Sequence, residues 1–100
     1  MDKVVVLFTM KGCPFCVDMK NLLEEENIDF VDRDIDEYEE EHNLFVEITQ
    51  NDYVPSFMLI ENPTTEPKST LYAPDRDYED IYEGVKIIKE WVENNKQNLS

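Results

Sequence analysis

Hydrophobic residues follow a strand pattern and then a helix pattern in the first third of the chain. The continuous run Val4–Phe8, rich in β-branched residues, is typical of a strand buried on both faces. It is followed by hydrophobic residues at helical spacing, which are Phe15, Met19, Leu22 and Leu23. Pro14 suits the first turn of such a helix, because its missing N–H is not needed there. Asn27 suits the left-handed residue that ends it.

The two patterns continue to alternate over the rest of the chain. The further predicted elements are a strand over Ile28–Ile35, a helix over Tyr38–Gln50, strands over Ser56–Ile60 and Tyr78–Tyr82, and a last helix after Gly84. The second helix is expected to turn Leu44, Phe45 and Ile48 inward. The stretch Glu61–Asp77 contains three prolines and is expected to be a long excursion, extended in part near Leu71–Ala73.

The predicted order β-α-β-α-β-β-α indicates an α/β fold with a central mixed four-stranded sheet flanked by helices. Helices between the early strands imply parallel pairing there and a sheet covered on both faces. A chain of 100 residues is the size of one domain, so residues 1–100 are predicted to form a single unit.

The net charge of −15 narrows the range of partners. It argues against binding to nucleic acids and to anionic membranes, which would repel the protein. The charge could act as a solubilising surface or could steer a basic partner, and the sequence leaves both open. The apolar run Val4–Phe8 is too short for a signal peptide or a membrane span, so we expect a cytoplasmic protein.

The chemistry is expected at Cys13-Pro14-Phe15-Cys16. Structural disulfides are rare in the cytoplasm, which favours a redox role for the two cysteines. Cys13 would lie at the helix N-terminus, where N–H groups, the helix dipole and the nearby Lys11 favour the reactive thiolate. Cys16, one turn further on and more buried, would resolve a mixed disulfide. The alternative, half of a zinc site, lacks a second ligand pair, since His42 is the one histidine and is expected at the surface.

Val54-Pro55 is the second candidate feature, because it directly precedes an apolar strand. A cis bond there would present the backbone of Val54 to a substrate. The alternative is an ordinary proline at the start of a strand.

Together these features resemble the glutaredoxin family within the thioredoxin-like fold. Cys13-Pro14-Phe15-Cys16 is similar to the family's dithiol site, preceded by Lys11, and Val54-Pro55 is similar to part of its T-V-P motif. The resemblance implies that Cys13 is the nucleophile and Cys16 the resolving thiol.

The same resemblance implies a ligand and partners. Glutathione would be a co-substrate held by Lys11, Phe15, Val54, Pro55 and Gly84, with no bound cofactor and no metal. Partners would be disulfide-containing proteins, among them ribonucleotide reductase, and the protein would act as a monomer.

One stretch departs from that family. Glutaredoxins usually have a glycine pair before the last helix, where this chain has Tyr82-Glu83-Gly84-Val85, which is more similar to thioredoxins. Glu83 would repel the γ-glutamyl carboxylate of glutathione. The alternatives are therefore a thioredoxin-like reductant that does not use glutathione, and a non-enzymatic docking or iron–sulfur-binding module.

Overall fold

The computed structural model describes residues 3–97 and confirms the α/β order of elements. The elements are β1 (Lys3–Thr9), α1 (Pro14–Glu25), β2 (Val31–Asp34), α2 (Glu39–Thr49), β3 (Ser56–Glu61), β4 (Lys68–Tyr72) and α3 (Ile81–Gln97). Pro14 occupies the first turn of α1, and Asn27 has a φ of 58° just after this helix, both as predicted. None of the described helices is long and apolar enough to span a membrane.

The four strands form one mixed sheet in the order β2-β1-β3-β4. β1 pairs parallel with β2, as the helix between them requires, whereas β3 is antiparallel to both β1 and β4. Parallel pairing is therefore restricted to the first two strands. Phe8 lies opposite Ser56, so the end of β1 and the start of β3 are neighbours. The segments that follow β1 and precede β3 consequently meet at one end of the sheet.

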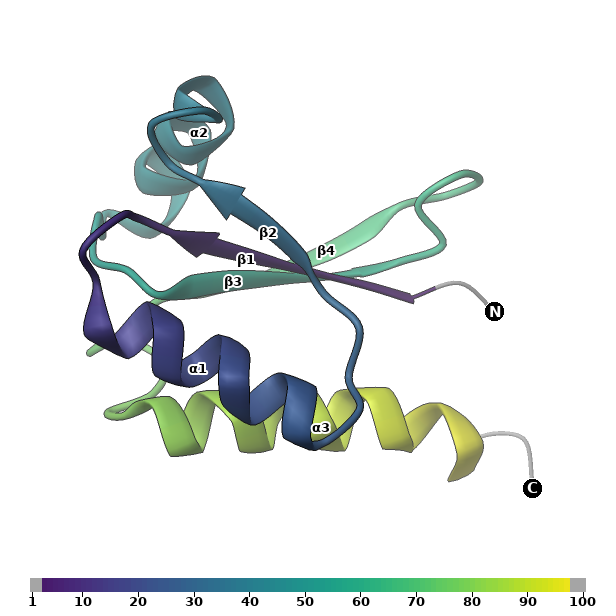
Figure 1. The fold of residues 1–100 in the computed structure, drawn as a ribbon. Helices are drawn as coiled ribbons and strands as arrows, with labels where there is room; N and C mark the ends of the chain where they lie inside the picture. The colour runs from purple at the N-terminus through teal and green to yellow at the C-terminus, as the bar shows by residue number, and fades with distance from the viewer. Residues whose placement is uncertain (1–2, 98–100) are drawn as a thin grey trace.

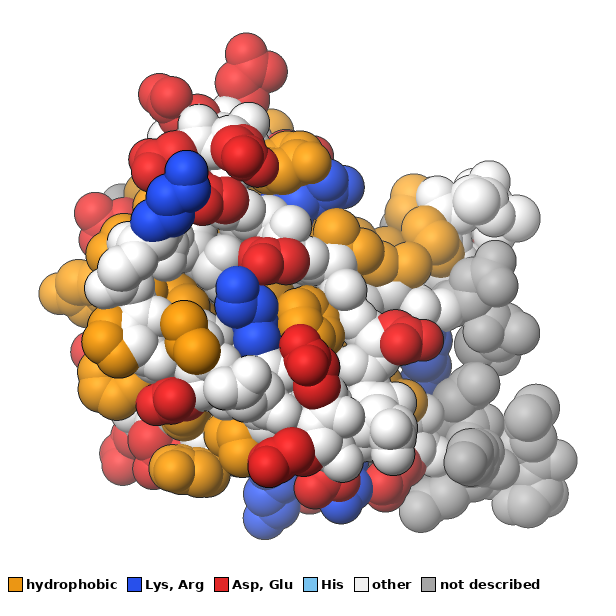
Figure 2. Space-filling view, in the orientation of Figure 1, with side chains coloured by type: hydrophobic (Ala, Val, Ile, Leu, Met, Phe, Trp, Pro, Cys, Tyr) orange, Lys and Arg blue, Asp and Glu red, His pale blue; other side chains and the backbone are white. Residues whose placement is uncertain are grey.

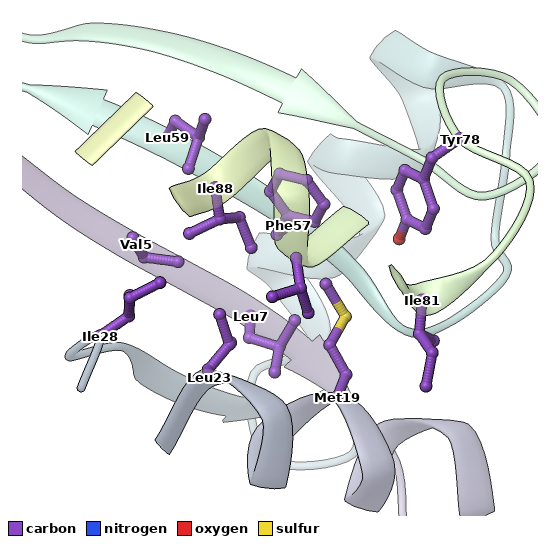
Figure 3. Close-up of a cluster of buried hydrophobic side chains, with 11 residues drawn as sticks. Val5, Leu7, Met19, Leu23, Ile28, Phe57, Leu59, Tyr78, Ile81 and Ile88 are labelled. Carbon is purple, nitrogen blue, oxygen red and sulfur yellow. The ribbon is translucent and has the colours of Figure 1, made fainter. Parts of the chain in front are cut away.

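Helices cover both faces of the sheet (Figure 1). α1 and α3 lie side by side on one face, and α2 lies on the other. Since neighbouring residues of a strand point to opposite faces, Val5 and Leu7 pack toward α1 and α3 while Val6 and Phe8 pack toward α2. Figure 3 shows side chains from the sheet, α1 and α3 converging on the larger of these two clusters. Each fully buried side chain of this kind contributes about 1.5–3 kcal/mol.

The inward face of α2 differs from the prediction. Leu44 and Ile48 are 60% and 70% exposed, and the residues that face the sheet are His42, Phe45 and Thr49. Both sets have helical spacing. The packing of Phe45 against Phe8, with ring centroids 5.2 Å apart, determines which set faces the sheet.

His42 is buried, so the prediction that it lies at the surface was wrong. It is 7% exposed, and its ring packs edge-on against Phe8 with 5.4 Å between centroids. Burial lowers the pKa of His42 below its ordinary value, against the opposing charge of Asp52. The neutral imidazole is therefore the form that the fold favours.

The prediction of a strand over Tyr78–Tyr82 was also wrong. The fourth strand, β4, lies within the predicted excursion and forms a hairpin with β3, in which Glu61 pairs with Lys68. Tyr78 makes only an isolated bridge with Pro74, and α3 already begins at Ile81. Gly84 therefore lies inside the first turns of a helix and does not end a strand.

The start of α3 has a local cause in a capping box. The Asp80 carboxylate accepts a hydrogen bond of 2.9 Å from the Glu83 N–H, and the Glu83 carboxylate accepts one of 3.2 Å from the Glu79 N–H. The first bond satisfies one of the N–H groups that a helix N-terminus leaves free, and the second ties Glu83 to the residue before Asp80.

Candidate functional site

Cys13 and Cys16 form a disulfide at the N-terminus of α1, with their Cα atoms 5.2 Å apart. Gly12 adopts a φ of 76°, a conformation that favours glycine, in the turn that leads from β1 to Cys13. Cys13 is the N-cap residue, and its Sγ accepts a hydrogen bond of 3.1 Å from the backbone N–H of Cys16. Cys13 is 7% exposed and Cys16 1%, which confirms that the second cysteine is the more buried.

The surroundings of Cys13 favour a negative charge on its sulfur despite the charge of the whole chain. The Cys16 N–H and the positive end of the α1 dipole both lie at the Sγ. The first turn of α1 contains no acidic residue, whereas α2 and α3 both begin with acidic residues. The first turn of α1 therefore adds no carboxylate that would oppose the positive end of the helix dipole at Cys13.

We expect Cys13 of the reduced protein to react with iodoacetamide at neutral pH about tenfold faster than Cys16, or more. The reason is that thiols at helix N-termini have pKa values of about 3.5–7.5, and that Cys16 is shielded. Mass spectrometry of partly alkylated protein measures the ratio, and fully unfolded protein is the control in which both thiols should react alike. Equal labelling of the folded protein, or preferential labelling of Cys16, would contradict the assigned roles.

The Val54–Pro55 bond is cis, as predicted, and lies just before β3. Pro55 is held by Tyr78, whose hydroxyl donates a hydrogen bond to the Pro55 carbonyl oxygen. The Tyr78 ring is buried and stacks on Phe57, with 5.4 Å between centroids. Burial, together with the charge of Asp77, raises the pKa of Tyr78, so this side chain remains a neutral donor. Tyr78, which precedes α3, thus holds Pro55, which precedes β3, in place.

A groove of about 750 Å³ lies at this end of the molecule. It brings together three of the predicted site residues, which are Phe15, Val54 and Pro55. Its other hydrophobic and aromatic lining residues are Met10, Tyr53, Pro74, Tyr78, Ile81 and Tyr82. The first turns of α1 and α3 lie at the same end in Figure 1, which explains how residues from both helices share one groove.

The other four predicted site residues, Cys13, Cys16, Lys11 and Gly84, are not among the residues that line this groove, although Phe15 stands between the two cysteines in the chain. Lys11 is exposed in the loop before Cys13. Gly84 is buried, and a Cβ at this position would lie 3.1 Å from the Met19 Cε and 3.3 Å from a ring carbon of Tyr78. The glycine therefore allows α3 to pack closely against Met19 and Tyr78.

Sequence reasoning missed much of the groove, including Met10, Tyr53 and Tyr78. One available signal was Asp80 followed three residues later by Glu83, a spacing that is typical of a helix start. It would have located the N-terminus of the last helix in the chain, with Tyr82 in its first turn. In the structure this first turn lies at the groove. The contact between Tyr78 and Pro55 has no such local signal.

Comparison with known proteins connects this geometry to one family. The glutaredoxin family model matches residues 5–59, more than half of the chain, including both cysteines and the Val54–Pro55 bond. Together with the mixed four-stranded sheet and three helices, the match confirms the predicted thioredoxin-like fold. No curated protein sequence matches the chain significantly. The wall of the groove formed by Pro74–Tyr82 lies outside the matched region.

Proposed function

The chain belongs to the glutaredoxin family and is thereby a thiol–disulfide oxidoreductase in kind, and we propose that it reduces protein disulfides and glutathione mixed disulfides through Cys13 and Cys16. The observation that carries the proposal is the disulfide at the N-terminus of α1, in which the Cys16 N–H donates to the Cys13 Sγ. The same N–H stabilises the thiolate once the pair is reduced.

The reaction proceeds in two exchanges. The Cys13 thiolate attacks one sulfur of the substrate disulfide, so that a bond from Cys13 to the substrate forms and the substrate S–S bond breaks, releasing one thiolate. Cys16 then loses its proton and attacks the Cys13 sulfur, which forms the Cys13–Cys16 disulfide and releases the second substrate thiol. The substrate gains two electrons and two protons, and the protein dithiol loses them.

The oxidised pair must then be reduced by an external thiol, and we propose glutathione for this step. Lys11 offers a cation near Cys13, and Phe15 and the Val54 backbone line the adjoining groove. Two glutathione molecules would reduce the disulfide and leave as oxidised glutathione.

We also propose that the protein works as a monomer in the cytoplasm, on disulfide-containing proteins for which ribonucleotide reductase is the family's example. A net charge of −15 disfavours self-association and repels nucleic acids and anionic membranes. Dithiols that cycle between two redox states are typical of reducing compartments.

A second candidate is a thioredoxin-like reductant that does not depend on glutathione. It is supported by the N-terminus of α3, where the Asp80 carboxylate accepts from the Glu83 N–H and the Glu83 carboxylate from the Glu79 N–H. The Asp80 carboxylate thus occupies an N–H group of the helix N-terminus from which an anionic ligand would otherwise accept a hydrogen bond, and the Glu83 carboxylate adds negative charge beside it.

The test is turnover of 2-hydroxyethyl disulfide with two electron sources. In one arm glutathione, glutathione reductase and NADPH supply the electrons, and in the other thioredoxin reductase and NADPH do so. We expect NADPH oxidation above the protein-free background in the glutathione arm. Turnover in the thioredoxin reductase arm alone would favour the second candidate, and no turnover in either arm would refute oxidoreductase activity.

A further inference from the structure

The groove beside the cysteines has an exposed apolar floor. Met10, Phe15, Tyr53 and Tyr82 are 44%, 63%, 58% and 68% exposed, and they are half of the large exposed hydrophobic side chains among residues 3–97. Figure 2 shows hydrophobic side chains gathered at the end of the molecule where α1 begins. Such a concentration beside a reactive disulfide is typical of a surface that binds another chain.

The rim of the groove is acidic. Its lining includes five carboxylates and no lysine or arginine, the carboxylates being Asp18, Asp52, Asp75, Glu79 and Asp80. The ion pairs in the described part of the chain involve other acidic residues, which are Glu26, Asp32, Glu41 and Asp77. In the part of the chain that the structure describes, no lysine or arginine forms an ion pair with a carboxylate of the rim.

Like charges around an apolar hollow reinforce one another, because field lines are focused where solvent is partly excluded. Glutathione carries two carboxylates and one ammonium group, so this field opposes its entry. A segment rich in lysine or arginine gains from the same field, and an apolar side chain beside its disulfide can cover the aromatic floor. The charge and the apolar surface thus favour the same kind of ligand.

We propose that this groove selects disulfides in cationic segments of partner proteins that carry a neighbouring apolar residue. The inference rests on the proposed function, since Cys13 must attack the disulfide that the groove positions and Cys16 must release the reduced segment. The Pro74–Tyr82 wall, which supplies three of the five carboxylates, lies outside the region that matches the glutaredoxin family.

The experiment compares two cyclic disulfide peptides. They share the same ring and one adjacent Phe, and differ only in three flanking Lys or three flanking Glu residues. The reduced full-length protein is mixed with each peptide, and single-turnover rates are measured by acid quenching and chromatography. We expect the Lys peptide to react roughly tenfold faster or more at low salt, which is the lower end of electrostatic steering. The two rates should converge as rising salt shortens the Debye length to ~3 Å at 1 M.

Two triple variants remove the same amount of charge from different places. Asp18→Asn, Asp52→Asn and Asp75→Asn neutralise the rim, while Asp80 is kept because it caps α3. Glu47→Gln, Glu66→Gln and Glu90→Gln neutralise exposed residues outside the groove. The Lys-to-Glu rate ratio should fall severalfold toward unity in the rim variant and stay at the wild-type value in the matched control.

The outcomes separate the inference from the proposed function. Equal rates with the two peptides, or an equal fall of the ratio in both triple variants, would overturn selection by the groove while leaving the oxidoreductase intact. Failure to reduce either peptide or the neutral 2-hydroxyethyl disulfide would refute the proposed function itself.

Discussion

Replacing Cys13 with Ser should reduce the rate of disulfide exchange to that of the uncatalysed reaction. The chain contains only two cysteines, and Cys16 is 1% exposed, so no other thiol can attack the substrate in place of Cys13. Cys16→Ser should retain activity on glutathione mixed disulfides, because free glutathione can resolve the intermediate on Cys13. Its activity on protein disulfides should fall, since resolution is then intermolecular.

The measurement is the rate of NADPH oxidation in the coupled glutathione assay, together with mass spectrometry of the trapped intermediate. Cys16→Ser should accumulate a mixed disulfide on Cys13. Val17→Ser, at an exposed position in the same turn of α1, is the matched control and should retain full activity. An active Cys13→Ser protein, or an adduct on Cys16 of the wild type, would require the two roles to be reassigned.

Features with a local cause could be predicted from the sequence. The strand over Val4–Phe8 needs only a run of β-branched residues, and the start of α1 needs only Pro14 at its first turn. Asn27 tolerates a positive φ, so the end of the helix was also predictable. The redox pair follows because its two cysteines are separated by one helical turn and need no distant partner.

Features that depend on packing could not be predicted in the same way. In α2 the exposed pair Leu44 and Ile48 has the same helical spacing as the buried His42 and Phe45. Hydrophobicity favours the former set, but the aromatic contact of Phe45 with Phe8 determines which face turns inward. Phe15 has the same helical spacing as the buried Met19 and Leu23, yet it is 63% exposed and lines the groove.

In the segment before α3, a local signal and a contact between residues distant in sequence both determine the structure. The stretch Tyr78–Tyr82 was predicted to be a strand, whereas in the structure Asp80 and Glu83 form the hydrogen bonds that start a helix. The position of Tyr78 itself is set by a contact with Pro55, a residue 23 positions away. No local pattern encodes such a contact, so the second wall of the groove could be found only from the fold.

Tyr78→Ala is expected to lower the free energy of unfolding by about 3–5 kcal/mol, the usual cost of truncating a buried aromatic side chain. The Tyr78 ring is 4% exposed and packs between Phe57 and the backbone of Gly84. Tyr78→Phe keeps the ring but leaves the buried Pro55 carbonyl without its donor, which should cost about 1–3 kcal/mol. Tyr82→Ala, with a ring that is 68% exposed, is the control and should change the free energy by about 0.5 kcal/mol or less.

Urea unfolding curves of the oxidised proteins measure these differences, and their pH dependence tests separately whether burial raises the pKa of Tyr78. Because the pKa of Tyr78 is raised in the folded state, its contribution should be complete below the ordinary tyrosine pKa of about 10 and should decline as the pH rises above it. Tyr78→Phe lacks the ionisable group, so the gap between it and the wild type should narrow over this alkaline range. A Tyr78→Ala protein as stable as Tyr82→Ala would show that the ring is not packed against Phe57. A gap between wild type and Tyr78→Phe that does not narrow above pH 10 would show that the pKa of Tyr78 is not raised in the folded protein.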